Sequence, residues 1–166
     1  MRHPDRDGMQ AMSGVPRSLP LKEVSWLSLD IQVTFDVHDL EVMSRFWALA
    51  LDYEQEPPPP GFSSWEEFAE QNNLRPELWR AAVVDPERKR PRLFFQPVPE
   101  GKTAKNRVHL DLRASAGADG EEGRERARQH ARRLVEAGAT VLHEMDEPIG
   151  WCIVMTDPEG NEFCVT

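Results

Sequence analysis

The chain has 166 residues, of which 39% are hydrophobic and 30% charged, and this composition is typical of a globular protein with its own core. Its formal net charge is −9, which disfavours nonspecific nucleic-acid binding, because such binding depends on Lys and Arg neutralising phosphates. No apolar run approaches the roughly 20 residues that a transmembrane helix needs. We therefore expect a soluble, cytoplasmic protein that binds neither nucleic acid nor membrane.

The N-terminal residues differ in composition from the rest of the chain. Residues 1–22 are rich in Pro, Gly, Met and charged side chains and show no hydrophobic periodicity, so we expect a disordered tail. They hold no apolar stretch of the kind that a secretory signal contains. The folded domain is expected over residues 25–166. Its two cysteines, Cys152 and Cys164, belong to no CxxC or Cys/His cluster, and we expect free thiols.

The first half begins with a strand and a helix. Residues 24–37 alternate between apolar and polar, which predicts a strand with one face on a core. Asp39 can cap a helix over residues 40–51, where apolar side chains recur every three to four positions. The elements expected next are a short strand over residues 53–56 and a proline-rich loop over 57–60. A helical insert capped by Ser63 or Ser64 is expected over 63–79, and two strands over 81–84 and 92–98.

The second half repeats this order after a loop over residues 99–106. Residues 107–113 alternate, and residues 121–137 carry a helical pattern that ends at Gly138. Strands are expected over residues 140–144, 151–156 and 162–166. The sequence Asp157-Pro-Glu-Gly-Asn161 predicts a turn in which Gly160 has a positive φ.

Three motifs carry a resemblance to a known family. They are DLEVMSRFWALALDYE, RLFFQPVPEGKTAKNRVHLDLR and MTDPEGNEFCV, and they occur in this order over most of the chain. The chain resembles the vicinal oxygen chelate superfamily, which includes glyoxalase I, extradiol dioxygenases and bleomycin-resistance proteins, and within it the glyoxalase-like branch common in actinobacteria. The resemblance implies an α+β fold in which two βαβββ modules, over about residues 25–98 and 107–166, form a curved mixed sheet around a cup.

The resemblance also implies a place for a divalent metal. The family's four ligand positions fall on Gln32, Gln96, His109 and Cys164 in this sequence. Two of them depart from the pattern, because Gln96 is neutral and Cys164 replaces a carboxylate. Such a set is poor for Mg, Mn or Fe, which prefer anionic oxygen ligands. We therefore expect no metal cofactor.

Strand alternation gives an independent set of site residues. If the polar faces of four strands converge, they line a pocket with the side chains Gln32, Thr34, Phe94, Gln96, His109, Asp111, Glu162 and Cys164. Each has an ordinary alternative: His109 as a solvated or hydrogen-bonded residue instead of a ligand contact or metal ligand, Glu162 as a solvated edge residue instead of a general base. Tryptophans such as Trp65 and Trp79 are more often core residues than ligand platforms.

Three functions remain open on the sequence. The first is a protein that binds an unidentified small molecule in the cup. The second is a metal-dependent lyase or dioxygenase of the same superfamily. The third is a protein-interaction domain with a vestigial site. The sequence also leaves open whether the cup closes within one chain or in a homodimer.

Overall fold

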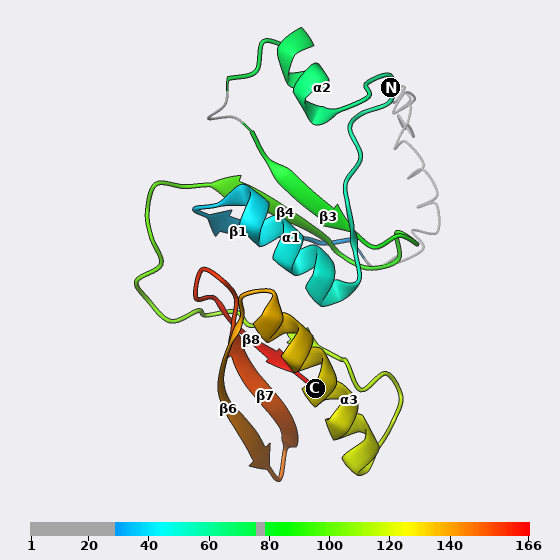
Figure 1. Ribbon diagram of the computed structural model, residues 1–166, viewed down its shortest axis with the longest axis vertical. Helices are drawn as coiled ribbons and strands as arrows, with labels where there is room; N and C mark the ends of the chain where they lie inside the picture. The colour runs from blue at the N-terminus through cyan, green and yellow to red at the C-terminus, as the bar shows by residue number, and fades with distance from the viewer. Residues whose placement is uncertain (1–28, 76–78) are drawn as a thin grey trace, which may run out of the picture.

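The computed structural model describes residues 29–75 and 79–166, which form eight strands and three helices in two modules (Figure 1). The first module consists of β1 (Gln32–Val37), α1 (Leu40–Leu51), β2 (Glu54–Gln55), α2 (Trp65–Gln71), β3 (Ala81–Val84) and β4 (Arg92–Pro97). The second module consists of β5 (Asp111–Leu112), α3 (Gly120–Glu136), β6 (Thr140–Glu147), β7 (Gly150–Thr156) and β8 (Glu162–Val165).

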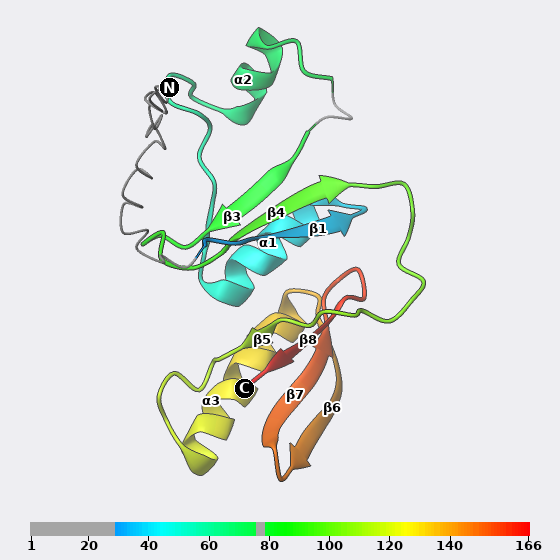
Figure 2. The same ribbon diagram turned by 180° about the vertical axis from the view of Figure 1, so that it is seen from behind.

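Each module has one four-stranded mixed sheet. Sheet one has the order β1-β4-β3-β2 and sheet two the order β5-β8-β7-β6. The first strand is parallel to the last in each module, and the other pairs are antiparallel. This arrangement confirms the predicted α+β fold with two βαβββ modules. The two curved sheets do not close into one, and helix α2, the predicted insert, lies at the end of the molecule away from module two in both views (Figure 2).

Helix α1 follows from local sequence. The Asp39 carboxylate accepts hydrogen bonds from the backbone N–H groups of Glu41 and Val42, both at 3.0 Å, which caps the helix as expected. Asp52 adopts a left-handed conformation with φ of 52° and ends it. The apolar stripe of α1 is buried against sheet one, whose strands β1, β4 and β3 lie behind the helix in Figure 1.

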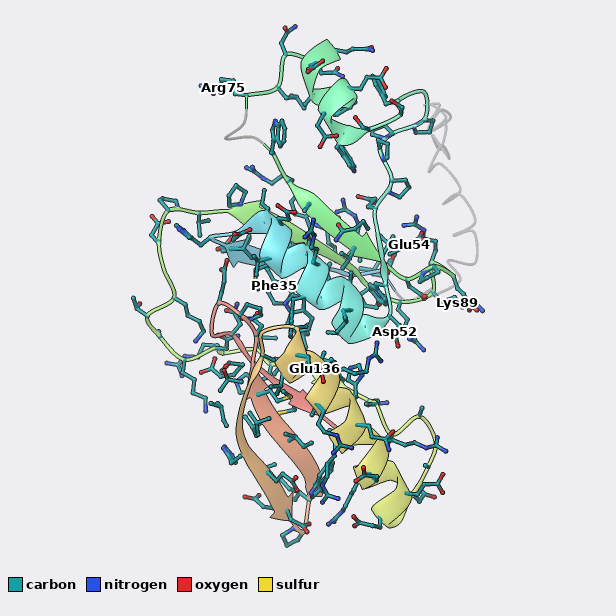
Figure 3. The ribbon with its side chains drawn as sticks, in the orientation of Figure 1. Phe35, Asp52, Glu54, Arg75, Lys89 and Glu136 are labelled. Carbon is teal, nitrogen blue, oxygen red and sulfur yellow. The ribbon has the colours of Figure 1, made fainter. Side chains whose placement is uncertain are left out.

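A single hydrophobic core joins the two modules. The Trp47 ring of α1 lies 5.4 Å from the Phe163 ring of β8, centroid to centroid. The two helices also touch at their ends, where Arg133 of α3 donates to Oδ1 of Asp52 at 3.3 Å. Figure 3 labels Asp52 at the end of α1 that lies next to α3. The modules are therefore fixed against one another by packing as well as by the connecting loop.

The turn between β7 and β8 is hydrogen-bonded to module one. The buried Asp157 carboxylate accepts from the backbone N–H groups of Glu159 and Asn161, at 3.0 and 2.9 Å. Gly160 has a φ of +86°, which confirms the predicted turn. The Glu159 carboxylate in turn accepts from the backbone N–H of His38 at 2.9 Å, at the start of α1.

Two predicted strands begin several residues later in the described structure. The expected first strand began at residue 24, but residues up to 28 lie outside the described part, and the described strand starts at Gln32. Leu29 and Ile31 were expected to pack on the core but are 91% and 62% exposed, because β4 begins only at Arg92, opposite Gln32.

The expected strand over residues 107–113 is wrong before Asp111. Only Asp111 and Leu112 pair with β8, opposite Cys164 and Val165. Val108, which was expected in the core, is 74% exposed as a result. The predicted tail over residues 1–22 lies outside the described residues. None of the three described helices is long and apolar enough to cross a membrane.

Candidate functional site

Four of the predicted site residues share one face of sheet one. Thr34 of β1 lies directly opposite Phe94 of β4, and Gln32 and Gln96 lie on the same face, two positions along their strands. The alternate residues of both strands, such as Phe35 and Phe95, face the core instead. The strand pairing therefore brings these four side chains onto the face turned away from α1.

Arg92 organises the polar groups on this face. Its guanidinium is paired with both carboxylate oxygens of Glu56, with Nε 3.0 Å from Oε1, and it also donates to Oε1 of Gln32. Its Cζ lies 4.8 Å from the centroid of the Phe94 ring, a cation–π contact. At the other end of the face, the Gln96 amide donates to Oδ1 of Asp36 at 2.6 Å. The side chains of Gln32 and Gln96 are thus held in place by neighbours.

A cavity of about 610 Å³ lies at the edge of sheet one, between the sheet and the insert, and reaches the face that carries Phe94. Its walls come from sheet one, from the first turn of α1, and from the insert between β2 and β3. Phe94 lines it, together with Arg92 and Glu56, whereas Gln32, Thr34 and Gln96 do not. The volume is within the range of small-molecule sites, which is roughly 300–1,000 Å³.

The other four predicted site residues belong to module two. Asp111 of β5 lies opposite Cys164 of β8, and Glu162 is on the same face of β8. His109 precedes β5 and is exposed. Burial, and the nearby Cys152 and Asp111 side chains, raise the pKa of the Cys164 thiol to about 12. Cys164 is therefore a neutral thiol near neutral pH and a poor nucleophile.

Glu162 anchors the loop that connects the modules. Its carboxylate accepts from the backbone N–H of Asn106 at 3.0 Å and pairs with the Lys102 ammonium at 3.1 Å. The Asn106 hydrogen bond and the Lys102 contact lower the pKa of Glu162 to about 2. A carboxylate with so low a pKa is too weak a base for proton abstraction near neutral pH.

The structure does not bring the eight predicted residues into one cup. Four of them lie on β1 and β4 of sheet one, and the other four on β8, on β5 or just before β5 in sheet two. Because the two sheets are not joined, one chain presents two separate polar faces. Each of the two faces contains half of the predicted lining.

The donors at the family's ligand positions do not fit a divalent metal. Gln32 already accepts from the Arg92 guanidinium, and a second cation beside it would be repelled. The Cys164 thiol holds its proton until about pH 12. Among residues 29–75 and 79–166, no three His, Cys, Asp or Glu side chains gather as a metal site requires.

Sequence reasoning missed the insert's part in the site. Trp65 and Trp79 line the cavity, and each is 42% exposed, although tryptophans were expected in the core. Glu56 and Arg92 were also missed. A signal for them was available in the sequence. Arg92 lies two residues before Phe94 and so shares its strand face, and Glu56 ends the neighbouring short strand. Opposite charges on adjacent strands often pair across a sheet.

The fold is that of a class of proteins built from two βαβββ modules. The sequence model of the glyoxalase-like domain matches residues 32–166, and the chain belongs to this family. No curated protein matches the chain.

Solved structures share the fold at low sequence identity. A glyoxylase/bleomycin resistance protein/dioxygenase domain from Frankia sp. EAN1pec is 18% identical, with a TM-score of 0.54, over 84% of this chain and 96% of that chain. The genomically encoded fosfomycin resistance protein FosX from Listeria monocytogenes is 12% identical, with a TM-score of 0.55, over 84% and 92%. A glyoxalase/bleomycin resistance protein/dioxygenase family enzyme from Burkholderia phytofirmans PsJN is 14% identical, with a TM-score of 0.53, over 81% and 94%. These likenesses show the fold.

Proposed function

We propose that the protein binds and sequesters a small molecule, and that the ligand occupies the cavity at the edge of sheet one, between the sheet and the insert. One observation carries this proposal. Phe94, which strand alternation alone assigned to the site, lines a cavity of about 610 Å³ together with Arg92 and Glu56. An aromatic wall with a few fixed polar groups is the usual composition of a small-molecule site.

The chemistry of the other site residues supports binding over metal-dependent catalysis. The Glu162 carboxylate is committed to Lys102 and Asn106, and Cys164 is a protonated thiol. Neither is suited to act as a general base or as an anionic metal ligand near neutral pH. The cavity, in contrast, requires no ionisable catalyst to hold a ligand.

A second copy of the chain is the partner that fits the open sheets. β1 is an outer strand of sheet one and β5 an outer strand of sheet two in the described part of the chain. Large apolar side chains next to these edges are exposed: Leu29 and Ile31 before β1, and Val108 before β5. Edges of this kind tend to pair with another strand. We propose that β1 of one copy approaches β5 of another, which would place the two polar faces around one cup.

Ligand binding is tested by a thermal-shift screen of the wild-type protein against a small-molecule library. We expect at least one compound to raise the melting temperature in a saturable manner. The variant Phe94→Ala should weaken binding of that compound about tenfold, because it removes an aromatic wall. The control is Leu142→Ala on β6, an exposed apolar residue that lines no part of the cavity. Equal affinities in wild type and Phe94→Ala would contradict the proposed site.

The dimer is tested by sedimentation velocity over a range of concentrations. We expect the wild type to sediment as a dimer. The double variant Ile31→Arg/Val108→Arg should sediment as a folded monomer, because it places like charges on both edges. The control Ile149→Arg changes an exposed apolar residue in the β6–β7 turn and should remain dimeric. A monomeric wild type at all concentrations would rule out the dimer and leave the ligand site of sheet one untouched.

A further inference from the structure

The insert supplies a rigid aromatic wall to the cavity. Trp65 of α2 donates its indole N–H to the backbone oxygen of Glu56 at 2.9 Å. The Trp65 and Phe68 rings meet edge to face at 5.7 Å, and Phe68 meets Phe62 in the same manner at 5.0 Å. These contacts fix the Trp65 ring before any ligand arrives, which lowers the entropic cost of binding.

Small side chains leave the space in front of this wall empty. Ala69 on α2 and Ala81 and Ala82 on β3 line the cavity, and none of them reaches across it. Trp65 and Trp79 therefore keep 42% of their surface exposed. Two large indoles that are left half open around one cavity form an apolar surface that a ligand can cover.

Glu56 connects the insert wall to the sheet wall. Its backbone oxygen holds Trp65, while its carboxylate holds Arg92, whose guanidinium lies over Phe94. Glu56, which directly follows β2, thus holds Trp65 on one side of the cavity and, through Arg92, contacts Phe94 on the other.

The charged groups of the lining are engaged with protein partners. Arg92 is neutralised by Glu56, Glu41 pairs with Arg45, and Arg80 donates to the backbone oxygen of Trp79. A backbone hydrogen bond and the Ser64 hydroxyl lower the pKa of the Glu66 carboxyl. A charged ligand would have to compete with these contacts, whereas an uncharged one would not.

We propose that the insert and sheet one together form a binding site for an uncharged, planar aromatic molecule of two or three rings. The ligand stacks against Trp65 and Trp79 and faces Phe94. This inference rests on the proposed function and names the ligand class for that site.

The test is a fluorescence titration of the full-length protein with N-phenyl-1-naphthylamine, an uncharged aromatic probe whose emission rises in apolar surroundings. We expect saturable binding to the wild type. Trp65→Ala and Trp79→Ala should each weaken binding about tenfold, since each removes a stacking partner. Trp79→Phe should retain binding within about threefold, because it keeps an aromatic face. The matched control is Trp151→Ala on β7, which contacts Arg124 and Arg128 and lies outside the cavity.

A cavity-filling variant, Ala81→Phe, tests the site without removing an aromatic ring. It should also abolish probe binding, and a melting temperature close to that of the wild type is the required check that the variant is folded. Absence of probe binding to the wild type, or affinities unchanged in Trp65→Ala, Trp79→Ala and Ala81→Phe, would overturn the inference. Tighter binding of the anionic analogue 8-anilinonaphthalene-1-sulfonate would overturn the preference for an uncharged ligand. If a non-aromatic compound then raises the melting temperature of the wild type but not of Phe94→Ala, the proposed function still stands. Failure of the aromatic ligand class is thus distinguishable from failure of the proposed function.

Discussion

The indole N–H of Trp47 donates to Oδ2 of Asp157 at 3.3 Å, and both side chains are buried. Trp47 belongs to α1 of the first module, and Asp157 begins the turn between β7 and β8 of the second. This hydrogen bond therefore joins the two modules inside their shared core. Burial raises the pKa of the Asp157 carboxyl, while bonds from Asn161, Glu159 and Trp47 oppose that rise.

Replacement of Asp157 should destabilise the fold strongly. Asp157→Ala leaves the Trp47 N–H and the turn N–H groups without their acceptor in a buried region, which costs about 2–4 kcal/mol of unfolding free energy. Urea denaturation followed by circular dichroism measures this loss. The control Asp146→Ala removes an exposed carboxylate on β6 and should change stability by less than about 1 kcal/mol. A similar loss in both variants would contradict the buried role of Asp157.

Stability should fall in acid partly through Glu162. Its pKa is about 2 in the folded protein, lowered from 4.5, so the folded state favours the ionised carboxylate. The stabilising contribution is full above about pH 5 and is lost as the pH falls through 4.5 toward 2. In Glu162→Gln the unfolding free energy should therefore depend less steeply on pH between 5 and 2.5. Parallel pH profiles for the wild type and Glu162→Gln would show that the Lys102 and Asn106 contacts do not operate in solution.

Glu159 should stabilise the start of α1. Its carboxylate accepts from the backbone N–H groups of His38 and Asp39, at 2.9 and 2.6 Å, where a helix begins and negative charge is favoured. Glu159→Gln should lower the unfolding free energy by about 1 kcal/mol. The exposed Glu147 of β6 offers a control, since Glu147→Gln removes one negative charge at a site away from α1. Equal melting temperatures for Glu159→Gln and Glu147→Gln would count against a stabilising contact between Glu159 and the start of α1.

The Cys164 thiol should be unreactive in the folded protein. Its pKa of about 12 leaves almost no thiolate at pH 7.5, and the thiolate is the reactive form. Iodoacetamide should therefore modify Cys164 at least tenfold more slowly in buffer than in denaturing urea, as peptide mass spectrometry can measure. Cys152 is buried and should be protected as well. Rapid alkylation of Cys164 in the folded state would show that the thiol is ionised, and would reopen the question of a metal or nucleophilic role.

Local pattern was enough to predict the modules and the faces of their strands. Alternation placed Gln32 and Thr34 on one face of the first strand, and Phe94 and Gln96 on one face of the strand over residues 92–98, because the direction of a side chain alternates along a strand. The pairing of the two strands then brought these faces together. Pairing beyond the strand was harder to foresee: Ile31 and Val108 continue the alternation, yet no partner strand reaches them in the described chain. The sequence also did not predict that the insert lines the cavity. Trp65 and Trp79 belong to no periodic pattern that would indicate which surface they face.

The most direct test of the central claim is an NMR titration of ¹⁵N-labelled wild-type protein with the compound that gives the largest thermal shift. We predict that the shifted amide signals cluster around the cavity, at residues such as Gln55, Ala82 and Phe94, and that Phe94→Ala reduces the shifts at equal ligand concentration. A second hollow lies between α3 and β6, where Arg128, Val135 and Val141 line it. Shifts confined to that hollow, or no shifts while the melting temperature still rises, would contradict a ligand site on sheet one.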